Sequence, residues 1–351
     1  MGAGMKIVDV AVIGAGLAGL ICAQQVQQAG YRVAVIEKSK GLGGRVATRR
    51  LAGTWADHGV RCLEQQGEQT AAWIQQLLQA GIIHCWTDKT DELSGTEIIP
   101  TDDTSPRYVA PDGITQIAKH LATGLTIYRG QRVLALLPTT QGWKFTLESI
   151  AEPAPDLLAK AIVVAIPAPQ ALDLLEPLAQ QGLSSEILAK LRSVEFDPCI
   201  TAIAVYAPEH QAAIAAAPWQ AIRCAHDPIL SWIGLESSKR PEAKQPVIIT
   251  QSTANFARQY FEATDLLAVG QKILDHAAAI TFPWLSHPQV LQVHRWRFAF
   301  ASRSLSESHL VSLRPLPLVC SGEWCGGSQI ETALQSGQAA AAQVLQTLCT
   351  H

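Results

Sequence analysis

Residues 10–19, VAVIGAGLAG, decide the fold that this sequence predicts. An apolar run, Ile7–Ile13, is typical of a buried parallel strand, and the glycine-rich turn that follows leads into a helix. A second apolar run, Tyr31–Ile36, predicts the next strand, and Glu37 follows it directly. Strand, turn, helix and strand in this order form a βαβ unit whose glycine spacing is typical of dinucleotide binding.

Each glycine of the turn has its own physical task. Gly14 permits the tight turn, Gly16 leaves room for a pyrophosphate, and Gly19 lets the helix pack closely on the sheet. The free N–H groups at the helix start attract an anion, and Glu37 is placed to accept hydrogen bonds from an adenosine ribose. The alternative is a glycine-rich turn that binds nothing. We predict cofactor contacts at Gly14, Ala15, Gly16, Leu17, Ala18, Gly19, Glu37 and Lys38.

The composition indicates a folded protein without a strongly charged surface. The chain has 351 residues, of which 48% are hydrophobic and 16% charged, so global disorder is excluded. The net charge of −3 gives no electrostatic footprint for nucleic acid or for an anionic membrane. We therefore predict neither as a partner, and the glycines of the longest apolar run argue against a membrane span.

The cysteines indicate a reducing environment. Eight are scattered along the chain, none forms a Cys-x-x-Cys pair, and no histidine spacing resembles a metal site. We predict no bound metal and a cytoplasmic location. No feature predicts an oligomeric state.

The segment after Glu37 contains Gly43-Gly44-Arg45, followed by Thr48-Arg49. Its glycines allow the backbone to approach a second phosphate face, and Arg45 supplies a guanidinium to pair with it. The order of GxGxxG, an acid and GGR-x-x-T-R resembles the FAD-binding half of the monoamine oxidase-type flavoprotein superfamily. NAD-binding Rossmann domains usually lack the GGR segment, so the resemblance implies FAD, with further contacts from Gly43, Gly44 and Arg45.

The C-terminal region carries a second pattern of this superfamily. Leu318–Glu323 is an apolar strand that ends in Gly322-Glu323, and a long helix follows over Ser328–Leu348. The resemblance implies that the acid binds the ribityl hydroxyls of the flavin and that the helix start points at its pyrimidine ring. There the helix dipole would stabilise negative charge on the reduced flavin. It also implies backbone contacts from Ile330, Glu331 and, at the adenine, Val133, and it places no cysteine for a covalent flavin bond.

These patterns predict an α/β protein in which a Rossmann-like FAD-binding domain holds an inserted mixed-sheet substrate domain. The resemblance implies the architecture of p-hydroxybenzoate hydroxylase and the amine oxidases. We assign 1–68, 108–175 and 300–351 to the discontinuous FAD-binding domain, and 69–107 and 176–299 to the substrate domain.

Three segments resemble the renalase branch: Ile166–Ala171 (IPAPQA), Ser237–Pro241 (SSKRP) and His294–Ala299 (HRWRFA). The resemblance implies oxidation of the 2- and 6-dihydropyridine isomers of NAD(P)H to NAD(P)+, with dioxygen as acceptor and hydrogen peroxide as product. Hydride transfer from a dihydropyridine needs no general base, because the ring nitrogen's lone pair drives it.

Three residues are candidates for work at the reacting centre: Trp296, His294 and Lys239. Trp296 either faces the flavin edge or fills the core, and the other two either contact substrate or are structural. Family members tend to carry a small residue and glutamine after an Asp-x-Gly motif, whereas Val60-Arg61 follows Gly59 here. His58, within this motif, is interpreted as a loop histidine bonded to backbone or as a proton relay.

Other functions remain open at this point. An amine oxidase is the alternative enzyme, although only Trp324 precedes the terminal helix where such enzymes commonly place aromatic side chains. A desaturase of carotenoid or porphyrinogen type would need a membrane-docking stretch, and none stands out. A non-catalytic FAD-binding protein is the alternative from another functional class.

Overall fold

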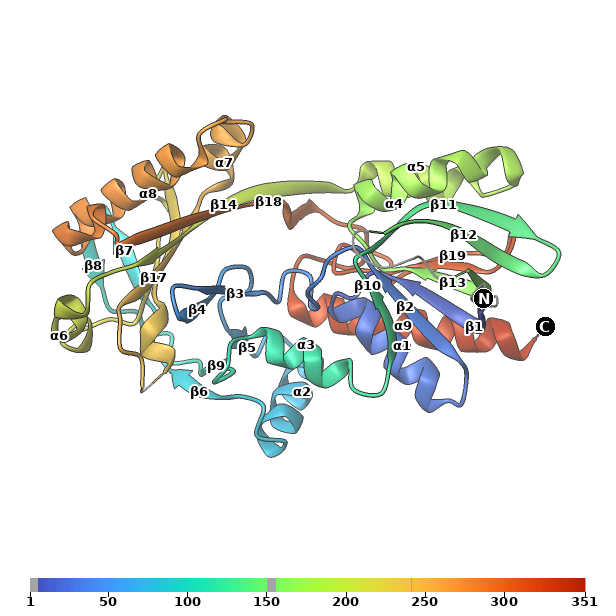
Figure 1. Cartoon of the computed structure of the whole chain (residues 1–351), viewed down its shortest axis with the longest axis horizontal. Helices are drawn as coiled ribbons and strands as arrows, with labels where there is room; N and C mark the ends of the chain where they lie inside the picture. Colours follow the sequence, from blue (N-terminus) through green and yellow to red (C-terminus); the bar gives the residue numbers. More distant parts are fainter. Residues whose placement is uncertain (1–5, 150–155, 241, 351) are drawn as a thin grey trace.

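The computed structural model describes residues 6–149, 156–240 and 242–350, and it contains two sheet-based bodies. Figure 1 shows them at opposite ends of an elongated molecule, joined above by the long strands β14 (Glu195–Val205) and β18 (Val290–Arg303). The first body contains both chain ends, and the second consists of the middle of the chain. The predicted α/β fold with a Rossmann-like half and a mixed-sheet half is confirmed.

The first sheet has eight strands in the order β10-β2-β1-β13-β12-β11, with β20 paired to β13 and β19 paired to β20. Strands β10, β2, β1, β13 and β20 run parallel, as βαβ connections require. The strands are β1 (Lys6–Ile13), β2 (Val33–Glu37), β10 (Thr126–Arg129), β11 (Gln131–Thr139), β12 (Gly142–Ser149), β13 (Leu157–Val164), β19 (Leu310–Ser312) and β20 (Leu318–Cys320).

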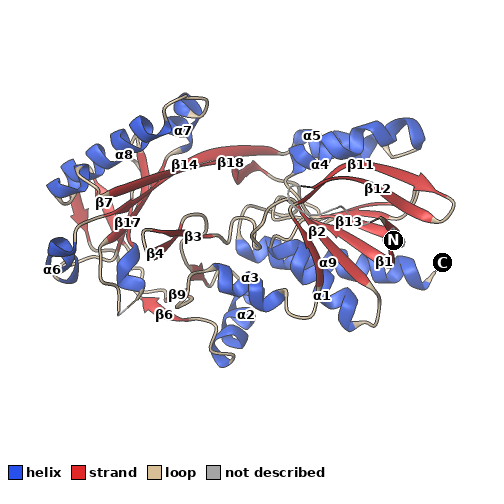
Figure 2. Ribbon diagram, in the orientation of Figure 1, coloured by secondary structure: helices blue, strands red, loops and turns tan. Residues whose placement is uncertain are grey.

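Helices cover both faces of this sheet (Figure 2). One face packs against α1 (Leu17–Gln28), α3 (Thr115–Leu121) and α9 (Ile330–Cys349), with α2 (Glu68–Gln79) beside them. The other face packs against α4 (Ala168–Leu175), η1 (Glu176–Gln181) and α5 (Ser185–Ser193).

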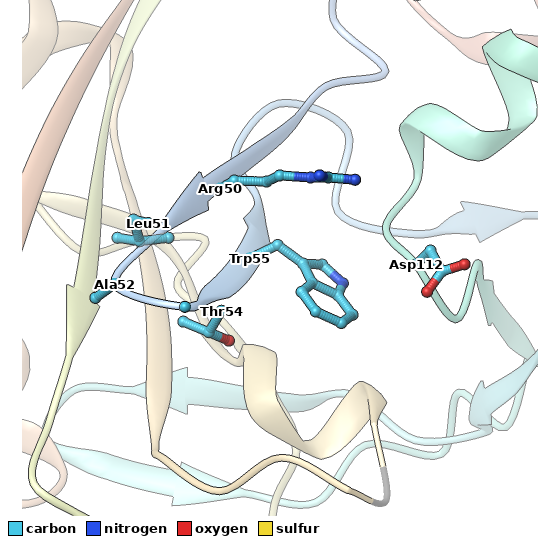
Figure 3. A pocket seen from close by; sticks show the side chains of 7 residues that line it. Arg50, Leu51, Ala52, Thr54, Trp55 and Asp112 are labelled. Carbon is cyan, nitrogen blue, oxygen red and sulfur yellow. The ribbon is translucent and has the colours of Figure 1, made fainter.

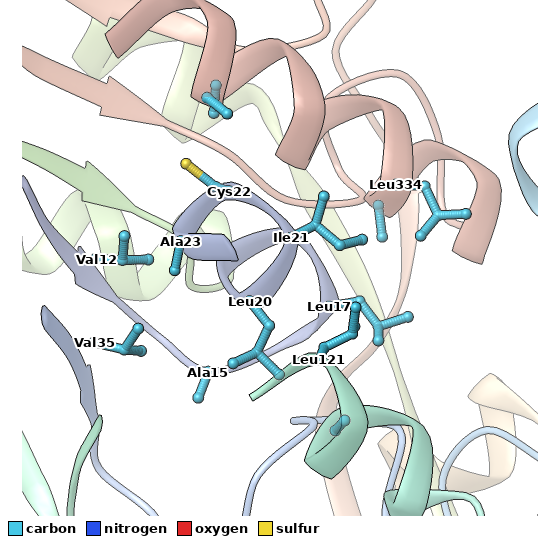
Figure 4. Close-up of a cluster of buried hydrophobic side chains, with 14 of the residues drawn as sticks. Val12, Ala15, Leu17, Leu20, Ile21, Cys22, Ala23, Val35, Leu121 and Leu334 are labelled. Carbon is cyan, nitrogen blue, oxygen red and sulfur yellow. The ribbon is translucent and has the colours of Figure 1, made fainter. Parts of the chain in front are cut away.

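Small residues bring α1 and α9 together. Figure 4 shows Ile21 and Cys22 on the side of α1 that lies next to α9, whereas Leu17 lies beside Leu121 of α3. A Cβ on Gly337 would lie 2.6 Å from the carbonyl oxygen of Ala18, so glycine is required at this contact. The C-terminal helix thereby packs firmly against the first helix of the βαβ unit.

The second sheet has seven strands in the order β18-β14-β17-β16-β15-β7-β8. One of its faces packs on α7 (Ala254–Tyr260), α8 (Leu266–Ile280) and α6 (Gln211–Ala215), and η2 (Pro208–His210) and η4 (Pro283–Ser286) lie beside these helices. The other face is directed toward the first body. Its remaining strands are β7 (Asp91–Ser94), β8 (Glu97–Ile99), β15 (Ala221–Arg223), β16 (Leu230–Leu235) and β17 (Val247–Ser252).

Short elements connect the two bodies. They are the hairpin of β3 (Thr48–Leu51) and β4 (Thr54–Asp57), the small sheet of β5 (Leu63–Glu64), β6 (His84–Thr87) and β9 (Arg107–Val109), and the turn η3 (Glu236–Lys239). No helix among the described residues is long and apolar enough to span a membrane.

Two expectations about individual elements are wrong, and the start of a third element is corrected. Asp88–Ser105 reads as a polar loop, yet it contains β7 and β8, because Leu93 is buried and Gly95 turns the chain with a φ of 63°. The alternation over Ile127–Leu137 predicts one strand, but Gly130, with a φ of 67°, divides it into β10 and β11. The long helix predicted over Ala263–Thr281 is confirmed as α8, but it begins only at Leu266, because the Asp265 carboxylate caps it at the backbone N–H of Ala268.

Candidate active site

The glycines of residues 10–19 differ in what surrounds them. Gly14 has a φ of 107°, and a Cβ there would lie 2.5 Å from the carbonyl oxygen of Ala165. A Cβ on Gly19 would lie 2.1 Å from the carbonyl oxygen of Gly14. Gly16 has an ordinary extended backbone, with φ −76° and ψ 177°, and a Cβ there would have no neighbour within 4 Å. Of the three, Gly16 alone faces free space, which fits a pyrophosphate at this position.

Glu37 ends β2 beside this turn and is buried. Its carboxylate accepts hydrogen bonds from the backbone N–H groups of Ala15 and Ser39, each at 2.8 Å. The loop at Gly43 is bonded to the same turn, because its N–H donates to the Ala15 carbonyl at 2.8 Å. A Cβ on Gly44 would approach the Gly16 Cα to 3.5 Å. The turn at Gly16 and the loop at Gly43-Gly44 thus lie next to each other with no side chain between them, an arrangement that fits a diphosphate.

Arg45 joins this loop to the C-terminal part of the chain. Its guanidinium forms an ion pair with Glu323 and donates to the carbonyls of Phe298 and Ala299, at 3.3 and 3.2 Å. The other carboxylate oxygen of Glu323, Oε1, is buried without a hydrogen-bond partner in the described residues. Because an unpaired buried acceptor is costly, this oxygen fits the role predicted for it, binding a donor such as a ribityl hydroxyl.

The start of α9 lies against α2. The Glu331 carboxylate accepts from the N–H groups of Gln69 and Thr70, at 3.1 and 2.7 Å, in the first turn of α2. Burial raises the pKa of Glu331, but these donors outweigh burial and lower it overall. The backbone N–H of Glu331 donates to the side-chain oxygen of Gln66 at 3.3 Å. The contacts predicted for Ile330 and Glu331 therefore stay predictions, since Gln66 already engages one of the two N–H groups.

Two further predicted contacts lie at the border of the first sheet. Val133 is half-buried in β11, beside an irregularity in its pairing with β12, and Lys38 is exposed at the end of β2. Both roles stay predictions.

Three ring side chains meet where β4 and β18 approach each other. The ring centroids of His58 and His294 are 4.8 Å apart, those of His294 and Trp296 4.4 Å, and those of His58 and Trp296 5.1 Å. The indole N–H of Trp296 donates to the carbonyl of His58 at 2.9 Å. A Cβ on Gly59 would lie 2.1 Å from the Arg45 carbonyl oxygen and 3.1 Å from the Trp296 ring. The ring cluster therefore lies directly beside the Arg45 loop.

Both imidazoles are held neutral. Burial lowers the pKa of His58 to about 4, and burial together with His58 and Arg49 lowers that of His294 to about 4. The Nδ1 of His58 lies 3.0 Å from the carbonyl oxygen of Ala47, which can only accept. Nδ1 is therefore the protonated nitrogen, and Nε2 keeps its lone pair. The ring nitrogens of His294 make no hydrogen bond with the described protein.

A polar row crosses the second sheet from this cluster. In the strand register His294 lies opposite Thr201, Thr201 opposite Gln251, and Gln251 opposite Trp232. The Thr201 hydroxyl donates to the His58 carbonyl at 3.0 Å, and the Gln251 amide donates to that of Gly59 at 2.9 Å. Residues 58–61 are thus fixed against the face of the sheet that looks toward the first body.

Lys239 lies in a buried ionic network behind these residues. Its ammonium is 2.7 Å from Glu236, 3.3 Å from Asp57 and 2.7 Å from the carbonyl of Arg61. Asp57 also accepts from the Thr48 hydroxyl and the Ile114 N–H, at 2.7 and 2.8 Å. Burial lowers the pKa of Lys239, but the two carboxylates outweigh burial and raise it overall. With all these acceptors in place, the ammonium is suited to holding the two bodies together; substrate contact stays a prediction.

Trp324, which precedes the terminal helix, points into the core. It is fully buried, and its indole N–H donates to the carbonyl of Ile166 at 3.1 Å. Its ring therefore cannot form the front wall of a substrate site. Among residues 6–149, 156–240 and 242–350, no group of three His, Cys, Asp or Glu side chains is arranged to hold a metal.

A separate cavity of about 540 Å³ lies at the β3–β4 hairpin. Figure 3 shows Arg50, Trp55 and Asp112 around it, with Arg50 and Trp55 on neighbouring strands. None of the predicted site residues lines this cavity.

The structure brings His294 and Trp296 together, as their spacing in one strand suggests, and places Lys239 apart in the ionic network. Sequence reasoning did not select His58, Thr201 or Gln251 as site residues. Their contacts join positions more than 140 residues apart, and the only signal was the departure from the family pattern around Gly59.

Family models match two parts of the chain. Residues 12–79 match the model described as NAD(P)-binding Rossmann-like domain, and residues 83–345 match the model described as Flavin containing amine oxidoreductase. The second match covers most of the chain, including His294, Trp296, Lys239 and Glu323, whereas His58 lies within the first match.

Individual relatives are similar in fold or over short stretches. Lysine-specific histone demethylase 1 homolog 1 of Arabidopsis thaliana is 48% identical over 50 residues, which span 14% of this chain and 6% of that protein. A putrescine oxidase bound to putrescine has a TM-score of 0.73 at 14% identity, over 98% of this chain and 100% of that one. Cyclohexylamine oxidase from Brevibacterium oxydans IH-35A has a TM-score of 0.69 at 13% identity, over 97% and 99%. At these identities the structural matches establish the fold alone.

Proposed function

The chain belongs to the flavin containing amine oxidoreductase family, and on this premise we propose that it binds FAD non-covalently and oxidises the 2- and 6-dihydropyridine isomers of NAD(P)H. Each turnover would convert one dihydropyridine, one dioxygen and one proton into NAD(P)+ and hydrogen peroxide. Bound FAD would supply the two-electron acceptor at its N5 atom and then pass the electrons to dioxygen.

The open glycine backbone and two carboxylates at the predicted positions fit FAD. The bare backbone at Gly16 and Gly44 would hold its diphosphate, and Glu37 its adenosine ribose. The unpaired Oε1 of Glu323 would accept a ribityl hydroxyl. Cys325 is buried, and burial raises the pKa of its thiol, which disfavours a thioether bond to the flavin.

One observation supports a dihydropyridine over an amine: the two imidazoles of the ring cluster are weak bases, because burial lowers the pKa of each to about 4. An amine is an ammonium ion at neutral pH and must lose a proton before its nitrogen can drive hydride release. An imidazole whose pKa is about 4 cannot take that proton efficiently. A dihydropyridine already carries the lone pair it needs.

The charges around the cluster support the same choice. Arg49 acts electrostatically on both His58 and His294, and it makes no ion pair among the described residues. The nearby Asp57 carboxylate is engaged by Lys239. A cationic amine would be repelled here, whereas a dinucleotide brings phosphate charges of the opposite sign.

In this proposal the chain's own residues orient the donor. Trp296 offers a ring face against which a planar dihydropyridine stacks, and the Nε2 lone pair of His58 accepts a hydrogen bond from its carboxamide. The hydrogen bond from Trp296 to the His58 carbonyl keeps both rings in place.

Aerobic turnover tests the proposal. Oxygen consumption and peroxide would be measured with FAD-loaded protein and 6-dihydro-NAD, 2-dihydro-NAD, ordinary NADH or benzylamine. We expect one dioxygen consumed and one peroxide formed for each isomeric dihydropyridine, with little from NADH or the amine. Turnover of benzylamine alone would make the protein an amine oxidase, and FAD retention without any turnover would favour a non-catalytic FAD-binding protein.

A further inference from the structure

Arg61 is a guanidinium without a carboxylate partner. Its Nε donates to the side-chain oxygen of Gln251 at 2.5 Å, and its guanidinium lies 4.5 Å from the centre of the Trp232 ring. Neither Nη atom has a hydrogen-bond partner in the described part of the chain, and neither is fully buried. The nearest acid along the chain, Glu64, is engaged by Arg107 at 3.2 Å. The two Nη atoms of Arg61 are therefore available as hydrogen-bond donors, while the Trp232 ring and the Gln251 amide hold the guanidinium in place.

A second arginine continues the polar row beyond Trp232. Arg223 lies opposite Trp232 in the strand register, is exposed, and forms no ion pair among the described residues. Glu92 lies on the strand beyond it but makes no ion pair with it either. Burial lowers the pKa of Arg61, Cys199, Cys62 and Glu64 raise it, and Arg223 lowers it again, with the net direction downward. Two guanidinium groups that each lack an ion pair repel one another, and an anion bound between them would relieve this repulsion.

The polar row runs from His294 of the ring cluster through Thr201 and Gln251 to Trp232. His294 lies on β18 and Trp232 on β16, with β14 and β17 between them, so three strand spacings, about 14 Å in total, separate the two positions. Arg61 reaches the row from residues 58–61, whose other end carries His58. A ligand whose ring lies at the cluster would extend along this row toward the arginines.

We propose that Arg61 and Arg223 form an anion subsite that binds the phosphate groups of the substrate while its reacting ring lies at His294 and Trp296. The subsite rests on the proposed function for the identity of the ring, but its anion chemistry rests on the two arginines alone. In a dinucleotide a ribose separates the phosphates from the dihydropyridine, so the phosphates would lie partway along the row, on the side where Arg61 is bonded to Gln251.

Binding of inorganic pyrophosphate to FAD-loaded protein tests the subsite without turnover. We expect calorimetry to detect binding to the wild type, and Arg61→Gln to weaken it about tenfold or more, because charge-assisted hydrogen bonds are lost. The exposed Arg223→Gln should weaken binding less and cannot disturb the core. Arg297→Gln is the matched control: Arg297 is an exposed arginine of β18 that pairs with Glu262 at 2.8 Å, and its loss should leave the affinity unchanged.

Pyrophosphate that binds folded Arg61→Gln and Arg223→Gln as tightly as the wild type, or that does not bind the wild type, would overturn the subsite. Flavin reduction by 6-dihydro-NAD and by 1-methyl-1,6-dihydronicotinamide, which lacks phosphates, then separates subsite from function. We expect Arg61→Gln to lower the ratio of their second-order rate constants about tenfold. If both dihydropyridines reduce the flavin and Arg61→Gln leaves the ratio of their rate constants unchanged, the subsite is refuted and the proposed function stands. If neither dihydropyridine reduces the flavin but pyrophosphate binding depends on Arg61, the subsite stands and the proposed function is refuted.

Discussion

Replacement of Gly16 by valine separates cofactor binding from folding. The backbone at Gly16 already has a conformation that any L-residue adopts, and no atom lies within 4 Å of the added Cβ. Valine restricts the unfolded chain, which stabilises the protein by about 0.4–1 kcal/mol, while a poorer helix N-cap costs about as much. We therefore expect the free energy of unfolding of the apoprotein to change by no more than about 1 kcal/mol.

FAD binding should respond very differently. The valine methyl groups would occupy the space that the pyrophosphate needs, and each lost hydrogen bond to a charged group costs about 1.5–3 kcal/mol. The loss of two such bonds weakens FAD binding by about 10²–10⁴-fold. FAD at a hundred times its Kd stabilises the wild type by about 2.7 kcal/mol, and the variant should lose this gain.

The assay is thermal unfolding with and without FAD, combined with the flavin absorbance of the purified protein. Gly41→Val is the control, because Gly41 is also an open position outside the predicted contacts. A Gly16→Val protein that retains FAD in full would refute the cofactor assignment. An apoprotein destabilised by several kcal/mol would refute the account of Gly16 as a position with free space.

Other perturbations have equally definite outcomes. Gly19→Ala should destabilise the apoprotein itself by about 3 kcal/mol or more in urea unfolding, because its Cβ would lie 2.1 Å from the Gly14 carbonyl oxygen; an unchanged midpoint would contradict this. Lys239→Met should destabilise by about 3–5 kcal/mol, since it leaves Asp57 buried without a cation and Glu236 with only Arg240, at 3.8 Å, and adding Asp57→Asn should recover part of the loss. The free energy of unfolding should fall as the pH drops from about 6.5 toward 4, because His58 takes up a proton in the unfolded chain but stays neutral in the folded protein. In acid titrations monitored by circular dichroism, His58→Gln should reduce the dependence of stability on pH over this range. Glu323→Ala should weaken FAD binding about tenfold or more in an equilibrium titration if Oε1 holds the ribityl chain; unchanged affinity would exclude that role.

Local patterns predicted the Rossmann-like half of the fold well. The spacing of Gly14, Gly16 and Gly19 reflects constraints within one turn, and the structure provides the contacts that make the first and last of them obligatory. The terminal strand and helix were also recognisable from local pattern, since Leu318–Cys320 is an apolar, buried run and Ile330–Cys349 is a helix with one buried face.

The ring cluster and the ionic network could not be predicted in this way. His58 meets His294 across more than 230 residues, and Lys239 meets Asp57 across 182. Such pairs depend on how β3, β4 and η3 pack between two sheets, and no local pattern encodes that packing. Trp324 illustrates the limit: its position before α9 is that of a substrate-facing aromatic, yet its side chain turns inward to Ile166.

The most direct test of whether this protein oxidises isomeric dihydropyridines is an anaerobic spectrum of the FAD-loaded protein titrated with 6-dihydro-NAD. We predict that this isomer reduces and so bleaches the flavin stoichiometrically, that the colour returns in air, and that benzylamine causes no bleaching at neutral pH. A flavin that stays oxidised with the isomer, or that is bleached by the amine instead, would contradict this prediction.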